Sequence, residues 1–190
     1  MDALAHGLWA AAAATAAQRT GVKLRVLPFA LWATFPDVLA FGPSVAAGLV
    51  LLAVRGRSVL RPGYHGPHLH LGISLYAVGH SLIVFGAVFG LCALIARRPV
   101  LPLLGWLMHI LIDIPTHSSS YYATRFLWPL TDYGFEGVAW WTPWLLWSTY
   151  GGLALVYLLL WRAGWFRLTG RSATPHNPQP PTKRAEAPGR

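Results

Sequence analysis

The unit His109-Ile-Leu-Ile-Asp113 lies in an otherwise apolar stretch and could bind a metal ion. Residues four apart lie on one face of a helix, so one ion can take an imidazole nitrogen and a carboxylate oxygen from this segment. Pro115 tends to end the helix just after Asp113. His117 could then turn back toward the same site. The alternative is that His109 and Asp113 only form hydrogen bonds to neighbouring helices.

Three more ionisable side chains lie in apolar surroundings: His6, Asp37 and His80. Taken singly, Asp37 after Pro36 could be a helix N-cap, and His80 could be a buried, hydrogen-bonded histidine. An ionisable group at membrane depth costs ~2.5–3.5 kcal/mol at a helix centre, so something must compensate it. Together the candidates offer enough ligands for one divalent metal of the zinc type and nearly enough for two. The predicted ligands are His6, Asp37, His80, His109 and Asp113.

A zinc-like ion at such a site lowers the pKa of a bound water to about 7 and polarises a scissile phosphoryl or acyl group. Asp37 is the candidate catalytic base, because an aspartate not fully used as a ligand can accept the proton of that water. His117 is the candidate second proton carrier. Arg125 either holds a substrate phosphate or pairs with the nearby Asp132 and Glu136.

The composition indicates an integral membrane protein. Of the 190 residues 55% are hydrophobic and only 11% are charged, against about 25% charged in soluble domains. The single cysteine, Cys92, excludes a disulfide scaffold. The net charge of +9 reflects basic loops between apolar stretches, and no nucleic-acid partner is expected because no basic helix face or reading motif occurs.

The apolar stretches predict an all-α, polytopic membrane helix bundle. We expect four to five membrane helices, including an alanine-rich helix over the first 18 residues. The other spans are expected at about 29–54, 73–96, 99–114 and 142–161, since a span takes ~20 residues. A break at Phe41-Gly42-Pro43 could instead turn the first of these into a re-entrant hairpin.

The last part of the chain differs in composition. Residues 167–190 are rich in proline and basic side chains, and such a segment cannot bury enough apolar area to offset its ordering entropy. We predict a membrane-embedded helical domain over residues 1–166 and a disordered tail over residues 167–190.

The order of these motifs resembles the YdjM-like inner-membrane metal-dependent hydrolases. The matching stretches cover about residues 3–135, roughly 70% of the chain. They are Ala5-His6-Gly7, Phe35-Pro36-Asp37, Gly79-His80-Ser81, Gly105-Trp-Leu-Met-His109-Ile-Leu-Ile-Asp113 and Phe126-Leu-Trp-Pro129-Leu. The resemblance implies a multi-pass protein of the bacterial inner membrane. It also implies a distant similarity to zinc-dependent phospholipase C and single-strand nucleases, which hydrolyse phosphoesters.

The sequence departs from this family at residues 73–79, where the family often has a His-Arg pair. A second metal is therefore either missing or bound with the help of His70.

These observations lead to one predicted function and two alternatives. The first is a membrane metal-dependent hydrolase that acts on phosphoester or other lipid-derived bonds. Its partners are the lipid bilayer and a small-molecule or lipid substrate. The alternatives are a transporter or proton relay, because intramembrane Asp and His chains also mark ion pathways, and a non-catalytic membrane scaffold. Metal content separates the three hypotheses.

Overall fold

The computed structural model describes residues 1–56, 68–120 and 123–165. These ranges contain α-helices, short turns and extended loops but no β-strand, which confirms the predicted all-α fold for the described part. The predicted tail at residues 167–190 and the side chain of His70 lie outside the described residues.

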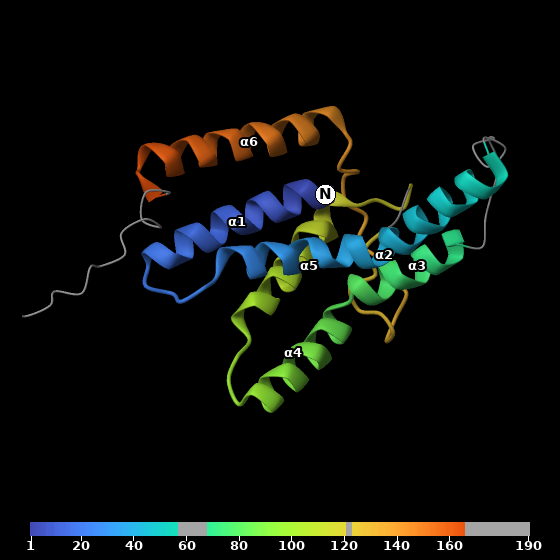
Figure 1. Ribbon diagram of the computed structural model, residues 1–190, viewed down its shortest axis with the longest axis horizontal. Coiled ribbons are helices and arrows are strands. Elements are labelled where there is room, and N and C mark those ends of the chain that lie inside the picture. Colours follow the sequence, from blue (N-terminus) through green and yellow to red (C-terminus); the bar gives the residue numbers. More distant parts are fainter. Residues whose placement is uncertain (57–67, 121–122, 166–190) are drawn as a thin grey trace, which may run out of the picture.

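Helices α1 (Ala3–Arg19) and α2 (Val26–Arg55) form an antiparallel pair at the start of the chain (Figure 1). Asp2 caps α1 by accepting a hydrogen bond from the backbone N–H of Ala5 at 3.0 Å. The run of alanines that follows favours a helix because alanine loses no side-chain entropy there. The predicted alanine-rich helix is therefore confirmed.

Helix α2 continues through two internal prolines, Pro36 and Pro43. Neighbouring helices can satisfy the carbonyls that proline frees in a membrane helix. Two sequence interpretations are therefore wrong. Phe41-Gly42-Pro43 does not break the helix, and Asp37 is not an N-cap, because it lies more than two turns inside α2.

Helices α3 (His68–Gly79) and α4 (Leu82–Ala96) meet at a bend of 61°. Ser81 starts α4 by accepting hydrogen bonds from the N–H groups of Ile83 and Val84, both at 3.1 Å. The predicted single span at residues 73–96 is thus a bent pair, and His80 at its corner is buried inside the helix bundle. Trp106 fixes this corner, because its indole N–H donates to the carbonyl of Gly79 at 2.6 Å.

Helix α5 (Leu104–Thr116) follows a short 3-10 helix at Leu101–Leu103 and crosses α2. Gly105 permits the close approach of the two helices, since a Cβ atom there would lie 2.1 Å from the carbonyl oxygen of Phe29. Pro115 does not end α5 directly after Asp113. The helix reaches Thr116, and His117 is its extended C-cap residue.

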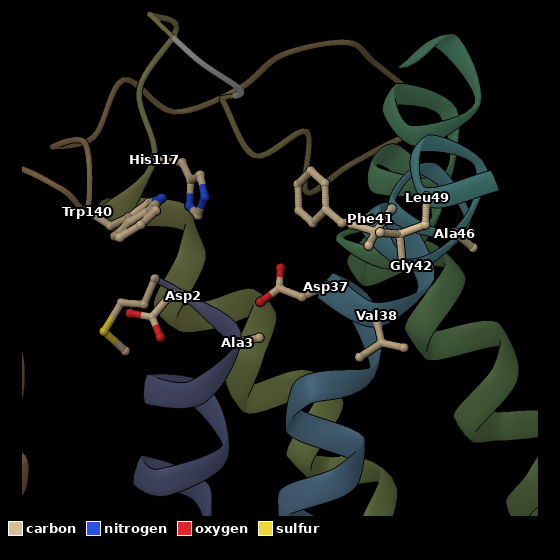
Figure 2. A pocket seen from close by; sticks show the side chains of 12 residues that line it. Asp2, Ala3, Asp37, Val38, Phe41, Gly42, Ala46, Leu49, His117 and Trp140 are labelled. Carbon is tan, nitrogen blue, oxygen red and sulfur yellow. The ribbon is translucent and has the colours of Figure 1, made fainter. Parts of the chain in front are cut away.

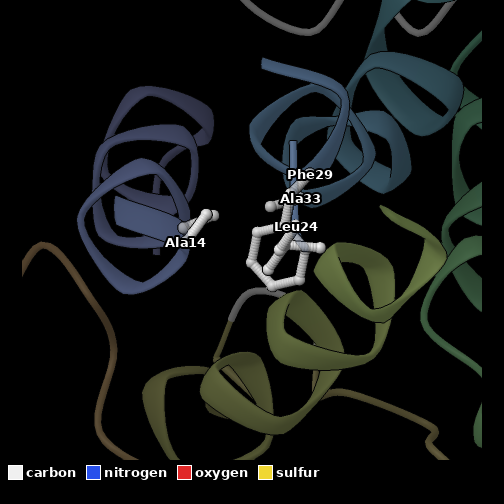
Figure 3. Close-up of a cluster of buried hydrophobic side chains, with 5 residues drawn as sticks. Ala14, Leu24, Phe29 and Ala33 are labelled. Carbon is white, nitrogen blue, oxygen red and sulfur yellow. The ribbon is translucent and has the colours of Figure 1, made fainter. Parts of the chain in front are cut away.

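Buried side chains of α1, α2 and the segment between them form the core cluster of Figure 3, and Leu104 and Met108 of α5 pack against it. The cluster comprises Ala10, Ala14, Leu24, Phe29 and Ala33. Helix α6 (Pro143–Arg162) packs on the other side of α1, where Leu153 contacts Met1 and Ala5 (Figure 1). Helix α2 is therefore the central element, with α1, α3 and α5 packed around it.

Two helices in the described part are long and apolar enough to cross a membrane: Val26–Val54 and Pro143–Arg162. The bent pair Leu71–Gly79 and Leu82–Ala96 makes a third if it acts as one span. The expectation of four to five membrane helices is therefore too high. The predicted span at 99–114 corresponds to α5, which at 13 residues is too short.

Candidate metal centre

The six ionisable side chains singled out in the apolar segments come together at the centre of the bundle. They come from α1, α2, the α3–α4 corner, α5 and the residue after α5, and all of them are buried. In that order they are His6, Asp37, His80, His109 with Asp113, and His117.

Backbone carbonyls orient two of the imidazoles. The Nδ1 atom of His80 lies 2.9 Å from the carbonyl oxygen of Tyr76, and that of His109 lies 2.7 Å from the carbonyl oxygen of Ala33. A carbonyl oxygen only accepts, so both Nδ1 atoms carry the proton and both neutral rings present a lone pair on Nε2. These two Nε2 atoms face each other at 2.9 Å. Two lone pairs at that distance repel, and either a metal ion beside them or a proton between them relieves the repulsion.

Two carboxylates complete this group. Asp113 Oδ2 lies 3.2 Å from His80 Nε2 and 3.3 Å from His109 Nε2. Asp37 Oδ1 lies 3.8 Å from each of the same nitrogens. The four ligand atoms all lie within 4.8 Å of one another. A tetrahedral zinc ion with ligands at 2.0–2.1 Å separates them by about 3.3–3.5 Å. The two distances from Asp113 are close to this spacing, whereas the distance between the imidazoles is shorter and those from Asp37 are longer.

The second oxygen of Asp113 faces a different set of groups. Oδ1 lies 2.8 Å from His6 Nε2 and 3.5 Å from His117 Nδ1, and it accepts from the amino group of Met1. His6 also packs its ring on that of His109, with centroids 3.8 Å apart. Thus His6 contacts Asp113 from the opposite side and lies outside the group of four that share one ligand space.

Unpartnered polar atoms indicate that the group of four fits a cation. Within the described residues, Asp37 Oδ2, Asp113 Oδ2 and His6 Nδ1 are buried and have no hydrogen-bond partner. A buried carboxylate oxygen without a partner costs free energy. Two imidazoles and two carboxylates are also ligands that zinc accepts. The buried cluster Asp37, His80, His109 and Asp113 could therefore hold a metal ion.

A chain of hydrogen bonds supports the cluster from the side of α3. The hydroxyl groups of Tyr76 and Thr124 lie 3.1 Å apart, and Thr124 donates to the backbone carbonyl of Asp113 at 3.2 Å. The ring of Tyr76 stacks on His80 with centroids 3.7 Å apart. The backbone and the side chain of Tyr76 therefore both position the site.

One cavity of about 580 Å³ opens onto this centre (Figure 2). Asp37 and His117 line one end of it, together with Asp2 and Trp140. Burial lowers the pKa of His117 to about 4, so its imidazole is neutral near neutral pH. A substrate in this cavity can therefore reach a carboxylate and a neutral imidazole at once.

Arg125 lies elsewhere. It donates to Asp132 at 3.0 Å, and both line a separate cavity of about 480 Å³ together with Tyr76. Of the two alternatives raised for Arg125, the structure shows the pairing with Asp132. Binding of a phosphate by Arg125 stays a prediction.

The sequence did not point to several residues that build the site. Tyr76 and Ala33 act through backbone carbonyls, which carry no residue-type signal. The helical spacing of the apolar cavity residues on α2 was present in the sequence, but α2 is apolar on every side and no stripe stood out.

Comparisons of the sequence and the structure with known proteins found no matching family model, no curated relative and no similar solved structure.

Proposed function

We propose that this chain is an integral membrane hydrolase that depends on a divalent metal of the zinc type and cleaves phosphoester or other lipid-derived bonds. The observation that carries the proposal is the convergence of two oriented Nε2 lone pairs and two carboxylates in one buried space. The resemblance of its motif order to the YdjM-like hydrolases supports the same activity.

Each residue has a distinct proposed role. His80, His109, Asp113 and the Oδ1 atom of Asp37 would hold the ion. When bound, the ion would lower the pKa of a water molecule to about 7 and polarise the scissile group. Asp37 borders the cavity, and its Oδ2 atom, which has no hydrogen-bond partner, would accept the proton of the attacking water.

His117 completes the proposed chemistry. It borders the same cavity and contacts Asp113 Oδ1 at 3.5 Å. His117 could take the proton from Asp37 and pass the same proton to the leaving group, so that its imidazole returns to the neutral form. His6, which contacts Asp113 from the opposite side, would hold that carboxylate in place.

The test is metal content together with hydrolysis. The protein is purified, loaded with zinc, dialysed and reconstituted in phospholipid vesicles. We expect at least one tightly bound zinc per chain and zinc-dependent release of lipid products, both lost in His109→Gln. Absence of bound zinc supports the scaffold. Absence of zinc or product, together with proton flux across the vesicles, supports the relay. Either result overturns the proposal.

A further inference from the structure

The cavity beside the metal centre is polar at one end and apolar along the rest of its length. Asp2, Asp37 and His117 lie at the polar end. The apolar part is lined by residues of α2, namely Val38, Phe41, Gly42, Val45, Ala46 and Leu49. A ligand that fills this space has a polar group joined to an extended apolar chain.

The apolar part is a groove that follows the axis of α2. Its residues recur at helical spacing from Val38 to Leu49, so they form one stripe about 16 Å long at 1.5 Å per residue. Gly42 leaves this part of the groove without a side chain, and a Cβ atom added there would meet only Val38, at 3.8 Å. Ala3 and Trp140 lie beside Asp2 and His117, on the side of the cavity that faces the residues of α2 (Figure 2).

The position of α2 identifies where the apolar chain comes from. Val26–Val54 is a candidate membrane span, and Val38, Val45 and Leu49 are exposed on it. The open side of the groove therefore faces the hydrocarbon of the bilayer, and an acyl chain can enter sideways without crossing water.

A second cavity is apolar but lacks a polar end, so it does not combine the two features of the groove along α2. It measures about 540 Å³ and lies between α1, α5 and α6. Its described lining includes Trp9, Met108 and Leu160 and contains no titratable side chain. Of these two cavities in the described part of the chain, it is the groove along α2 that joins an acyl-sized apolar stripe to groups that can do chemistry.

We propose that the groove along α2 binds one acyl chain of a membrane phospholipid and thereby places the polar linkage of that lipid beside Asp37 and His117. This rests on the proposed hydrolase function, whose substrate class it specifies as a bilayer phospholipid that enters laterally.

The experiment measures lipid retained by the full chain. Protein is stripped of metal with a chelator to prevent turnover and reconstituted in vesicles of phosphatidylethanolamine and phosphatidylglycerol in equal parts. The protein is then extracted in mild detergent, and native mass spectrometry measures its mass together with any bound lipid. We expect one retained phospholipid on the wild type. Val45→Trp fills the groove with an indole ring, and we expect loss of the lipid adduct.

The matched control is Val50→Trp. Val50 lies on the same helix and is 62% exposed, against 60% for Val45, but it does not line the groove. We expect this variant to keep the lipid. Gly42→Leu serves as a second groove variant, and circular dichroism verifies the fold of all three.

The proposal is overturned if the wild type retains no lipid, if both groove variants retain as much as the wild type, or if Val50→Trp loses it too. Zinc content, measured on separate metal-loaded samples, tests the proposed function independently. Retained lipid without zinc binding supports the lipid-binding groove and overturns the proposed hydrolase function. Zinc binding without retained lipid overturns the lipid-binding groove and leaves the proposed hydrolase function standing.

Discussion

Asp113 is the residue on which the candidate centre depends most. One carboxylate oxygen faces His80 and His109, and the other faces His6, His117 and the amino group of Met1. The side chain is completely buried. A carboxylate in such a place persists only when its neighbours compensate its charge, which explains why four imidazoles surround it.

Asp113→Asn keeps the shape of the side chain but removes the charge and one good oxygen ligand. We expect zinc affinity to fall by at least about 10–100-fold, since even the loss of a ligand's hydrogen-bond partner costs that much. A competitive titration against a chelator measures it. The control is Asp132→Asn, an exposed aspartate paired with Arg125, which should bind zinc like the wild type. Equal zinc in both variants would remove Asp113 from the ligand set.

His6→Gln tests whether His6 is a ligand or a support. Because His6 contacts Asp113 Oδ1 and not the shared ligand space, we expect about 10–100-fold weaker zinc binding with unchanged stoichiometry at saturation. The measurement is zinc per chain at high and low free zinc. A wild type that binds two ions, with one lost in His6→Gln, would show that His6 binds a second ion.

At the scale of helices, the site depends on how closely α5 approaches α2. Gly105 lies one turn before His109 and touches the backbone of α2 at Phe29. This contact fixes the position of α5 along α2 and the separation of the two helices. It thereby positions His109 and Asp113 relative to Asp37. The corner between α3 and α4 works in the same way for His80, because the Trp106 hydrogen bond to Gly79 holds it against α5.

Gly105→Ala should therefore disturb the fold and the site together. The added methyl group would lie 2.1 Å from the Phe29 carbonyl oxygen, and such overpacking costs about 1–3 kcal/mol or more. We expect a lower melting temperature in detergent and weaker zinc binding.

The matched control is Gly90→Ala on α4, where a Cβ atom meets nothing within 4 Å. Alanine is favoured over glycine in a helix by about 0.5–1 kcal/mol, so this variant should melt at the same or a higher temperature. Identical melting of Gly105→Ala and the wild type would show that the helices are not in close contact there.

For the whole molecule, the described site belongs to the first two thirds of the chain. Its ionisable side chains come from α1, α2, the α3–α4 corner and α5 with His117, whereas α6 packs on α1 and contributes none of them. The large exposed apolar side chains of α2 and α6, such as Leu49 and Trp147, fit contact with lipid.

Deletion of residues 172–190 should leave membrane insertion and zinc binding unchanged, because that composition offers no apolar face to pack. Two measurements compare the truncated protein with the full chain. One is resistance to alkaline extraction from membranes, and the other is zinc content. A truncated protein that no longer inserts, or that loses zinc, would contradict the predicted tail.

The sequence alone determined the features that depend on neighbours within one helix. The apolar runs predicted helices, and the spacing of His109 and Asp113 placed both on one face of α5, because helical periodicity is a local property. The predicted number of spans was wrong where local pattern and packing differ: α5 is too short, and residues 73–96 bend at His80.

Only the tertiary structure decided which side chains share a ligand space. Asp37 and His80 meet His109 because α2 and the α3–α4 corner pack against α5, and His6 reaches the opposite oxygen of Asp113. The carbonyls of Tyr76 and Ala33 that aim the two imidazoles have no sequence signature. Contacts between helices far apart in the chain follow from how side chains fit across an interface, and helical spacing within each segment contains no information about that fit.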